Sequence, residues 1–140
     1  MFDVLEKYKN WDHFFFCSDN SMADVCNAPT DNAGVYLVYA LKKGRIELVY
    51  IGRSGKLNRD GTLFIRKGGI KDRLVNGKRD GMLRTRFWRA EMINEEIEVL
   101  DIYWYVTESK GKFDCPDQVE DILLRNYKSI YGQRPKWNRT

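Results

Sequence analysis

The order of apolar and polar positions along the chain predicts alternating helices and strands. Phe2, Leu5, Tyr8 and Trp11 lie near helical spacing and predict an N-terminal helix over residues 2–16. Residues 17–33 contain Ser, Asn, Asp and Pro and predict a connecting loop. Strands are then predicted over about 34–41, 46–52 and 97–106, and helices over about 70–77, 81–93 and 116–131.

This order of elements, α-β-β-α-α-β-α, predicts the α+β fold class. The segment 34–41 is apolar at nearly every position and is therefore expected to be a central strand of a sheet covered on both faces. Residues 53–69, which contain four glycines and five basic residues, are expected to form a long basic loop. Because the chain has no internal repeat and no Pro/Ser-rich linker, we expect one domain over residues 1–140.

The first two strands carry two tripeptides, Gly34-Val35-Tyr36 and Tyr50-Ile51-Gly52. A three-residue loop over 42–44 would give Gly44 the left-handed position and would place Tyr36 directly opposite Tyr50. A two-residue turn at 43–44 would instead pair Tyr36 with Ile51 and put the two tyrosines on opposite faces. We favour the longer loop, which predicts that both hydroxyls lie on one face.

Charge is distributed unevenly along the chain, although the net charge is only +4. Residues 42–89 contain 15 Lys and Arg against four acidic residues, so this segment carries +11 and the remainder −7. A basic segment of this size favours binding of a polyanion such as nucleic acid, because phosphate contacts release condensed counterions. A solvated charged surface and a protein-interaction surface are the alternatives.

Several function classes are disfavoured by composition. No apolar run approaches the about 18 residues that span a membrane, so we expect no membrane association. The N-terminal residues lack a signal-peptide layout, and Cys17, Cys26 and Cys115 are odd in number, which favours reduced thiols in the cytoplasm. The single histidine, His13, argues against a zinc site or a histidine triad and is expected to be a surface or boundary residue of the N-terminal helix.

One acidic residue of the last helix lies on its apolar side. Leu124 and Tyr127 fall within about 40° of Glu120 around the helix axis. A carboxylate that points toward a core is costly unless it is paired. The two candidate partners are an arginine, the commoner one in general, and a divalent metal ion.

Taken together, these motifs resemble the GIY-YIG nuclease superfamily. The two tripeptides, separated by 13 residues, are similar to its signature, and residues 70–74 resemble its arginine-bearing helix. This similarity favours Arg73 as the active-site arginine, with Arg66 as the rival. Glu120, followed by Pro135 and Asn138, matches the order of the family's metal ligand and its structural asparagine.

The resemblance implies a three-stranded antiparallel sheet flanked by helices over residues 34–138, with residues 1–33 as an N-terminal helical extension. It also implies an endonuclease of restriction or phage type that hydrolyses DNA with one Mg²⁺ or Mn²⁺ ion held by Glu120. Tyr36 would be the general base and Tyr50 would orient the water or the phosphate. Arg73 would neutralise the charge that develops on the phosphate.

Further expectations concern substrate binding. Arg53 stands where relatives often have lysine and is a poor proton acceptor near neutral pH. The residues expected to contact double-stranded DNA are Arg53, Lys56, Arg66, Lys67, Arg84 and Arg86. Structural roles are expected for Gly34, Gly52 and Asn138. Two copies of the chain could act as a homodimer on a palindrome. The alternative function is a nucleic-acid-binding module that keeps the scaffold without catalysis.

Overall fold

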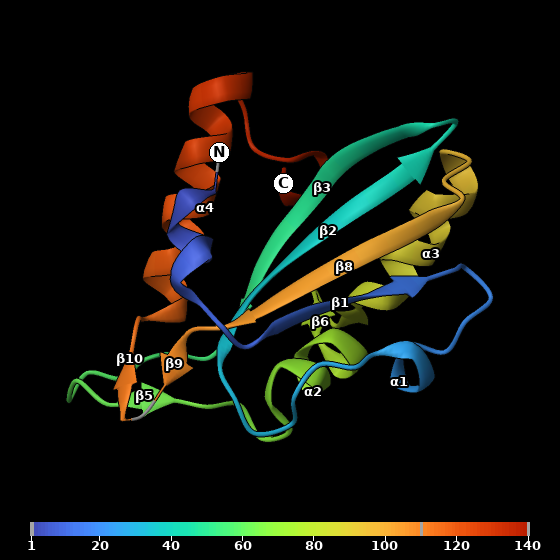
Figure 1. Ribbon diagram of the computed structural model, residues 1–140. Helices are drawn as coiled ribbons and strands as arrows, with labels where there is room; N and C mark the ends of the chain where they lie inside the picture. The colour runs from blue at the N-terminus through green and yellow to red at the C-terminus, as the bar shows by residue number, and fades with distance from the viewer. Residues whose placement is uncertain (1, 110, 140) are drawn as a thin grey trace.

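The computed structural model describes residues 2–109 and 111–139 and has an α+β architecture (Figure 1). Its centre is a four-stranded antiparallel sheet with the order β1-β8-β2-β3. The sheet strands are β1 (Trp11–Phe16), β2 (Gly34–Lys42), β3 (Arg45–Ser54) and β8 (Val99–Val106). The α-helices are α1 (Met22–Val25), α2 (Gly69–Asn76), α3 (Arg84–Asn94) and α4 (Pro116–Tyr131).

Short elements complete the fold. Two 3₁₀ helices, η1 (Asp3–Lys7) and η2 (Lys136–Asn138), lie near the ends of the chain. Three small two-stranded hairpins project from the main sheet. They are formed by β4 (Lys56–Leu57) with β5 (Leu63–Phe64), β6 (Lys78–Arg79) with β7 (Met82–Leu83), and β9 (Glu108–Ser109) with β10 (Lys112–Phe113).

The sheet is covered on both faces, which explains the apolar sequence of β2. Helices α1, α2 and α3 cover one face, and α4 with η1 lies on the other (Figure 1). Tyr36 and Val38 pack on the α2–α3 side, and Val35 and Leu37 pack on the α4 side. The expectation that 34–41 is a central strand is confirmed, since β2 pairs with both β3 and β8.

The predicted helix over residues 2–16 is wrong, and with it the three-stranded sheet. Residues 11–16 form the fourth strand, in which Phe14 and Phe16 are buried while Trp11 and Phe15 are about half exposed (49% and 52%). This alternation has the period of a strand, and aromatic side chains favour that conformation. His13 lies on this strand, not on a helix, and its Nδ1 is 2.8 Å from Asp101 Oδ1.

The β2–β3 turn is the two-residue turn, not the favoured three-residue loop. Lys43 and Gly44 both have positive φ, at 49° and 76°, as a type I′ hairpin requires. This turn alone would pair Tyr36 with Ile51, but Tyr36 is opposite Gly52, and Tyr50 is opposite Val38. A β-bulge shifts the register between Val38 and Tyr39.

The bulge nevertheless keeps the two tyrosines on one face. Val49 and Tyr50, although consecutive, both pack on the α2–α3 side, while the residues before and after them pack on the α4 side. This is the effect of one extra residue in β3. The rings of Tyr36 and Tyr50 are 6.0 Å apart between centroids, so the expectation of one shared face is confirmed for a different reason.

The remaining boundaries follow the sequence with local exceptions. The final helix ends at Tyr131 as expected, whereas the helix predicted over 81–93 begins only at Arg84, after the β6–β7 hairpin. The expected basic loop contains the β4–β5 hairpin, and the 17–33 loop contains α1. All three cysteines are free thiols. No helix in the described part of the chain is long and apolar enough to cross a membrane.

Candidate functional site

A polar pocket of about 360 Å³ lies at the edge of the sheet formed by β3. We call it the edge pocket. It combines five basic side chains with one carboxylate and one phenol, and it is lined by Tyr50, Arg53, Ser54, Gly55, Lys56, Phe64, Arg66, Arg73, Arg84 and Glu120. The structure thus brings together residues from β3, β4, β5, α2, α3 and α4.

The edge position of β3 explains how the two faces of the sheet contribute to one pocket. Tyr50 packs on the α2–α3 side. Arg53 is opposite Val35, which packs on the α4 side, and it meets Glu120 of α4. Because no further strand of the described residues pairs with β3 at this edge, side chains from both faces can converge there.

Glu120 pairs with Arg53, the arginine that follows the second tripeptide. Arg53 Nε lies 3.3 Å from Glu120 Oε1, and Arg53 Nη1 donates a hydrogen bond to the Gly55 carbonyl at 2.8 Å. Burial raises the pKa of the Glu120 carboxyl above its ordinary value, although the charges of Arg53, Arg73 and Arg84 act in the opposite direction. The ionised carboxylate therefore still carries a desolvation cost that these arginines do not offset. An additional positive charge near the carboxylate would reduce this cost.

Two other arginines contribute buried nitrogen atoms that lack partners. Arg73 Nε and Arg84 Nε and Nη1 are buried and have no hydrogen-bond partner among the described residues. Buried polar groups are usually paired, because an unpaired donor costs about 1–3 kcal/mol and a charged one costs more. Because Arg73 and Arg84 also line the edge pocket, their guanidinium groups can pair with an oxyanion there.

The two tyrosines differ in their access to the pocket. Tyr50 lines it, and Arg84 lies over the Tyr50 ring, with Cζ 5.9 Å from the centroid. Tyr36 is fully buried, and its hydroxyl has no hydrogen-bond partner among the described residues. Burial raises the pKa of Tyr36 well above its ordinary value, against the opposing charges of Arg73 and Arg84.

Arg66 and Arg73, the two candidates for the active-site arginine, both line the edge pocket but differ in their partners. Arg66 Nε bonds to Asp72 Oδ2 at 2.6 Å, so its charge is already neutralised within the protein. The hydrogen bond from Asn76, and after it the Arg66 contact, holds the pKa of Asp72 below its ordinary value. Arg73 keeps its Nε unpaired, so Arg73 is the better donor for a bound anion.

The expected structural residues lie around the two tripeptides. A Cβ on Gly34 would collide with the Tyr105 carbonyl of β8, and a Cβ on Gly52 would lie 2.5 Å from the Tyr36 hydroxyl. Asn138 bonds the Ile51 backbone twice, accepting from its N–H and donating to its carbonyl, both at 2.9 Å. Asn138 therefore satisfies the outer backbone groups of an edge strand.

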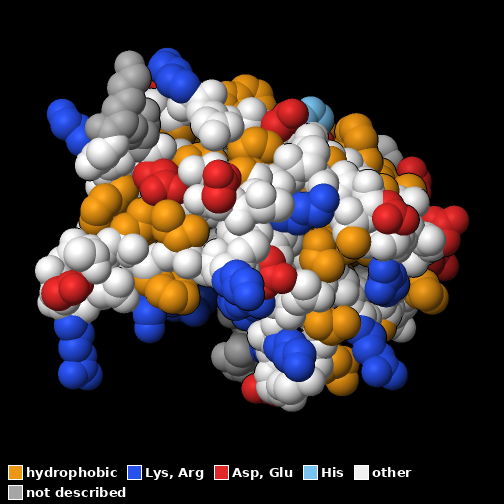
Figure 2. All heavy atoms as spheres, turned by 90° about the horizontal axis from the view of Figure 1, so that it is seen from below, with side chains coloured by type: hydrophobic (Ala, Val, Ile, Leu, Met, Phe, Trp, Pro, Cys, Tyr) orange, Lys and Arg blue, Asp and Glu red, His pale blue; other side chains and the backbone are white. Residues whose placement is uncertain are grey.

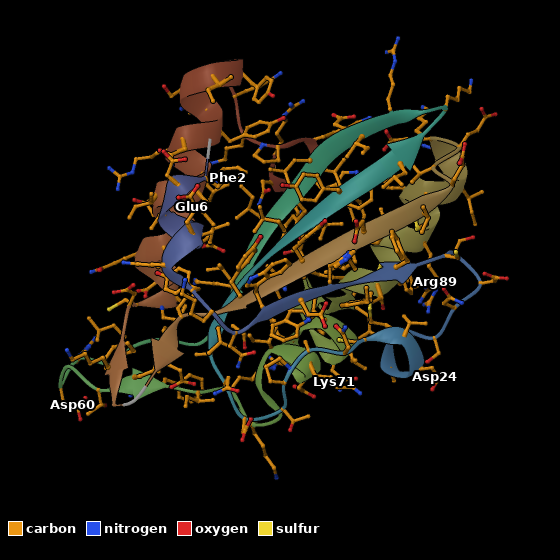
Figure 3. All side chains as sticks on the ribbon, in the orientation of Figure 1. Phe2, Glu6, Asp24, Asp60, Lys71 and Arg89 are labelled. Carbon is orange, nitrogen blue, oxygen red and sulfur yellow. The ribbon has the colours of Figure 1, made fainter. Side chains whose placement is uncertain are left out.

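Of the six basic residues expected to contact DNA, four line the edge pocket (Arg53, Lys56, Arg66 and Arg84), and Lys67 and Arg86 do not. Lys56, Lys67 and Arg86 are exposed. Most lysine and arginine side chains visible in Figure 2 lie in the lower half of that view, and most acidic side chains lie in the upper half. Arg89, labelled in Figure 3, instead donates to the Asn20 carbonyl at 2.7 Å and lies over the Phe16 ring.

The donor set is compatible with one cation that also binds substrate. The described residues contain no cluster of three or more His, Cys, Asp or Glu side chains. Mg²⁺, however, keeps several waters and is commonly held by one or two carboxylates together with substrate phosphates. Glu120 fits that role, because it is a partly buried carboxylate that lines the edge pocket together with Arg73 and Arg84.

The sequence did not reveal two features of the site. Arg84 was expected to contact a DNA backbone, yet its position at the start of α3, beside Tyr50, depends on the unpredicted β6–β7 hairpin. A second pocket beside Tyr50, which contains Phe87 and Trp137, was also missed. No protein-family model, curated protein or solved structure matches the chain.

Proposed function

We propose that the protein is a nuclease that hydrolyses phosphodiester bonds in the edge pocket with one divalent cation. The observation that carries this proposal is the convergence of Glu120 with the unpaired nitrogens of Arg73 and Arg84 at one edge of the sheet. The similarity of the two tripeptides to the GIY-YIG signature supports the same reaction class.

Phosphate binding rests on the arginines. Arg73 and Arg84 offer charged donors that no carboxylate of the described residues neutralises at the three buried nitrogen atoms. Donors that are already fixed in place stabilise the charge that grows on the phosphate oxygens in the transition state. Arg66, which also lines the edge pocket, is paired with Asp72 and has a supporting role.

Glu120 holds the Mg²⁺ or Mn²⁺ ion in this proposal. When bound, the ion polarises a phosphate oxygen and stabilises the leaving oxygen. Arg53 neutralises Glu120 in its absence and keeps the carboxylate oriented through the 3.3 Å contact. Since Arg53 also bonds Gly55, it has a second anchor when Glu120 binds a cation.

The roles of the tyrosines follow their exposure. The resemblance implied Tyr36 as the general base, but its burial and raised pKa favour a supporting role behind the pocket. Tyr50 lines the pocket, so its hydroxyl is the one that can hydrogen-bond the attacking water or the phosphate. We therefore assign water orientation to Tyr50 and pocket packing to Tyr36.

Plasmid nicking tests this assignment. Wild-type protein should nick supercoiled plasmid with Mg²⁺ or Mn²⁺ and not with EDTA, and Tyr50→Phe should lower the rate about 100-fold. Tyr36→Phe should keep at least a third of the rate. If wild type cleaves no DNA or RNA with either metal, the nuclease proposal fails. If Tyr36→Phe is the inactive variant, the division of roles is reversed.

The second candidate is a nucleic-acid-binding module without catalysis. The Arg53–Glu120 contact favours it, because that ion pair satisfies the one carboxylate that the described residues contribute to the edge pocket. Salt-sensitive binding of DNA without metal-dependent cleavage would support this function. Charge reversal at Arg84 should then weaken binding while every metal condition leaves the DNA intact.

A further inference from the structure

A second pocket of about 380 Å³ adjoins the edge pocket, and Tyr50 and Arg84 line both. We call it the aromatic pocket. Its lining includes Phe87 and Trp88 of α3 and Trp137 of η2. Its volume lies within the range of about 300–1,000 Å³ that is usual for small-molecule sites.

The rings of this pocket form a connected set. Trp88 and Trp137 are stacked with centroids 6.3 Å apart, and Phe87 meets Trp137 edge-on at 6.1 Å. Tyr50 is 5.8 Å from Trp88, which joins the set to the edge pocket. The tryptophans are nearly fully buried, whereas Phe87 is only partly buried and can offer a ring to a ligand.

The charge around these rings is mainly positive. Arg79 lies over the Phe87 ring, with Cζ 5.9 Å from the centroid, and Arg84 lies over the Tyr50 ring. Arg139 also lines the pocket, and so does Lys136, whose charge is paired with Glu95; Asp80 is the carboxylate among the described lining residues. An aromatic ligand that carries negative charge matches this combination of rings and guanidinium groups.

The hairpin of β6 and β7 provides an apolar rim. Met82 and Leu83 are 49% and 38% exposed although they are large and hydrophobic. Apolar side chains at such positions can pack against a base that has left its stack. A ligand with one end in the edge pocket and a flat ring in the aromatic pocket would contact both sets of residues.

We propose that the aromatic pocket binds one unpaired nucleobase beside the phosphate held in the edge pocket, so that the preferred substrate has an unpaired nucleotide at the cleavage site. This inference rests on the proposed nuclease function. A free mononucleotide presents the same chemistry, and the experiment below separates the two sources.

The test measures binding in metal-free buffer, which does not depend on catalysis. The probes are a DNA duplex with one bulged 2-aminopurine, the same duplex fully paired, and a 2-aminopurine mononucleotide. The wild type should bind the bulged duplex about tenfold more tightly than the paired one and quench its fluorescence. Phe87→Leu should bring the two affinities together, because it keeps an apolar side chain and removes the ring.

Phe15→Leu is the matched control, because Phe15 is exposed on β1 outside both pockets. It should behave as wild type. Equal wild-type affinities for the two duplexes, or an unchanged preference in Phe87→Leu, would overturn the inference. A mononucleotide that binds as tightly as the bulged duplex would also overturn it. Absence of cleavage with a retained, Phe87-dependent preference would remove the nuclease proposal alone and leave the base site standing.

Discussion

Substitution of Asn138 tests whether this one side chain holds the edge of β3 in place. Its Oδ1 accepts from the Ile51 N–H and its Nδ2 donates to the Ile51 carbonyl, each at 2.9 Å. Ile51 lies between Tyr50 and Arg53, two residues that line the edge pocket. Loss of these bonds should therefore affect both the stability of the protein and the position of the pocket residues.

The expected size of the effect follows from two lost hydrogen bonds. Each contributes about 1 kcal/mol net, and a partly buried N–H without a partner adds to the cost. Asn138→Ala should thus lower the free energy of unfolding by about 2–3 kcal/mol in urea titrations. Asn58→Ala is the control, because Asn58 Nδ2 bonds Thr62 within an exposed loop, and it should change stability by less than about 0.5 kcal/mol.

Asn138→Asp adds a pH dependence with a defined sign. The carboxylate keeps an acceptor for the Ile51 N–H but places a negative oxygen against the Ile51 carbonyl, so its pKa should rise in the folded state. The stabilising, protonated form exists at low pH and is lost as pH rises through that pKa. The deficit relative to wild type should therefore shrink between pH 7 and pH 4. A pH-independent deficit, or an Ala variant within about 0.5 kcal/mol of wild type, would refute the reasoning.

Two further predictions concern packing and charge beside the pocket. Gly52→Ala should destabilise the protein by about 3 kcal/mol, because the added Cβ meets the buried Tyr36 ring. Gly44→Ala has open space around it but a φ of +76°, and it should cost about 1 kcal/mol in the same urea assay. Equal costs for the two variants would contradict the packing argument. Burial raises the pKa of Glu120, so ionisation of this carboxyl lowers the stability of the folded protein. Glu120→Gln removes that charge and should therefore raise the free energy of unfolding at pH 8. That gain should shrink as pH falls, and a variant less stable than wild type at pH 8 would show that the Arg53 contact outweighs burial.

The α+β class and the central strand were predictable because they depend on apolar patterns that extend over many residues. The strand β1 was not, because Phe2, Leu5, Tyr8 and Trp11 fit helical spacing while residues 11–16 pair with β8, which is distant in sequence. Pairing with a distant strand overrides local spacing, and a single sequence gives little information about it.

The hairpin shows how a right conclusion can follow from a wrong register. The sequence gives no sign of the bulge at Val49, which restores Tyr36 and Tyr50 to one face after the two-residue turn would have separated them. The position of Glu120 on the apolar side of α4 could be predicted from the sequence, because helical periodicity alone gives the direction of its side chain. Its ion pair with Arg53 depends on tertiary contacts, and the sequence together with the resemblance had favoured a metal ion over an arginine as the partner.

The most direct measurement is single-turnover cleavage of supercoiled plasmid over a range of Mn²⁺ concentrations with wild type, Glu120→Gln and Asp121→Asn. Asp121 is the neighbouring carboxylate, exposed and paired with Arg125, so its variant should cleave as wild type does. Glu120→Gln should lose at least about 100-fold in rate at every concentration. A Glu120→Gln protein that cleaves at the wild-type rate would contradict the assignment of the cation to Glu120.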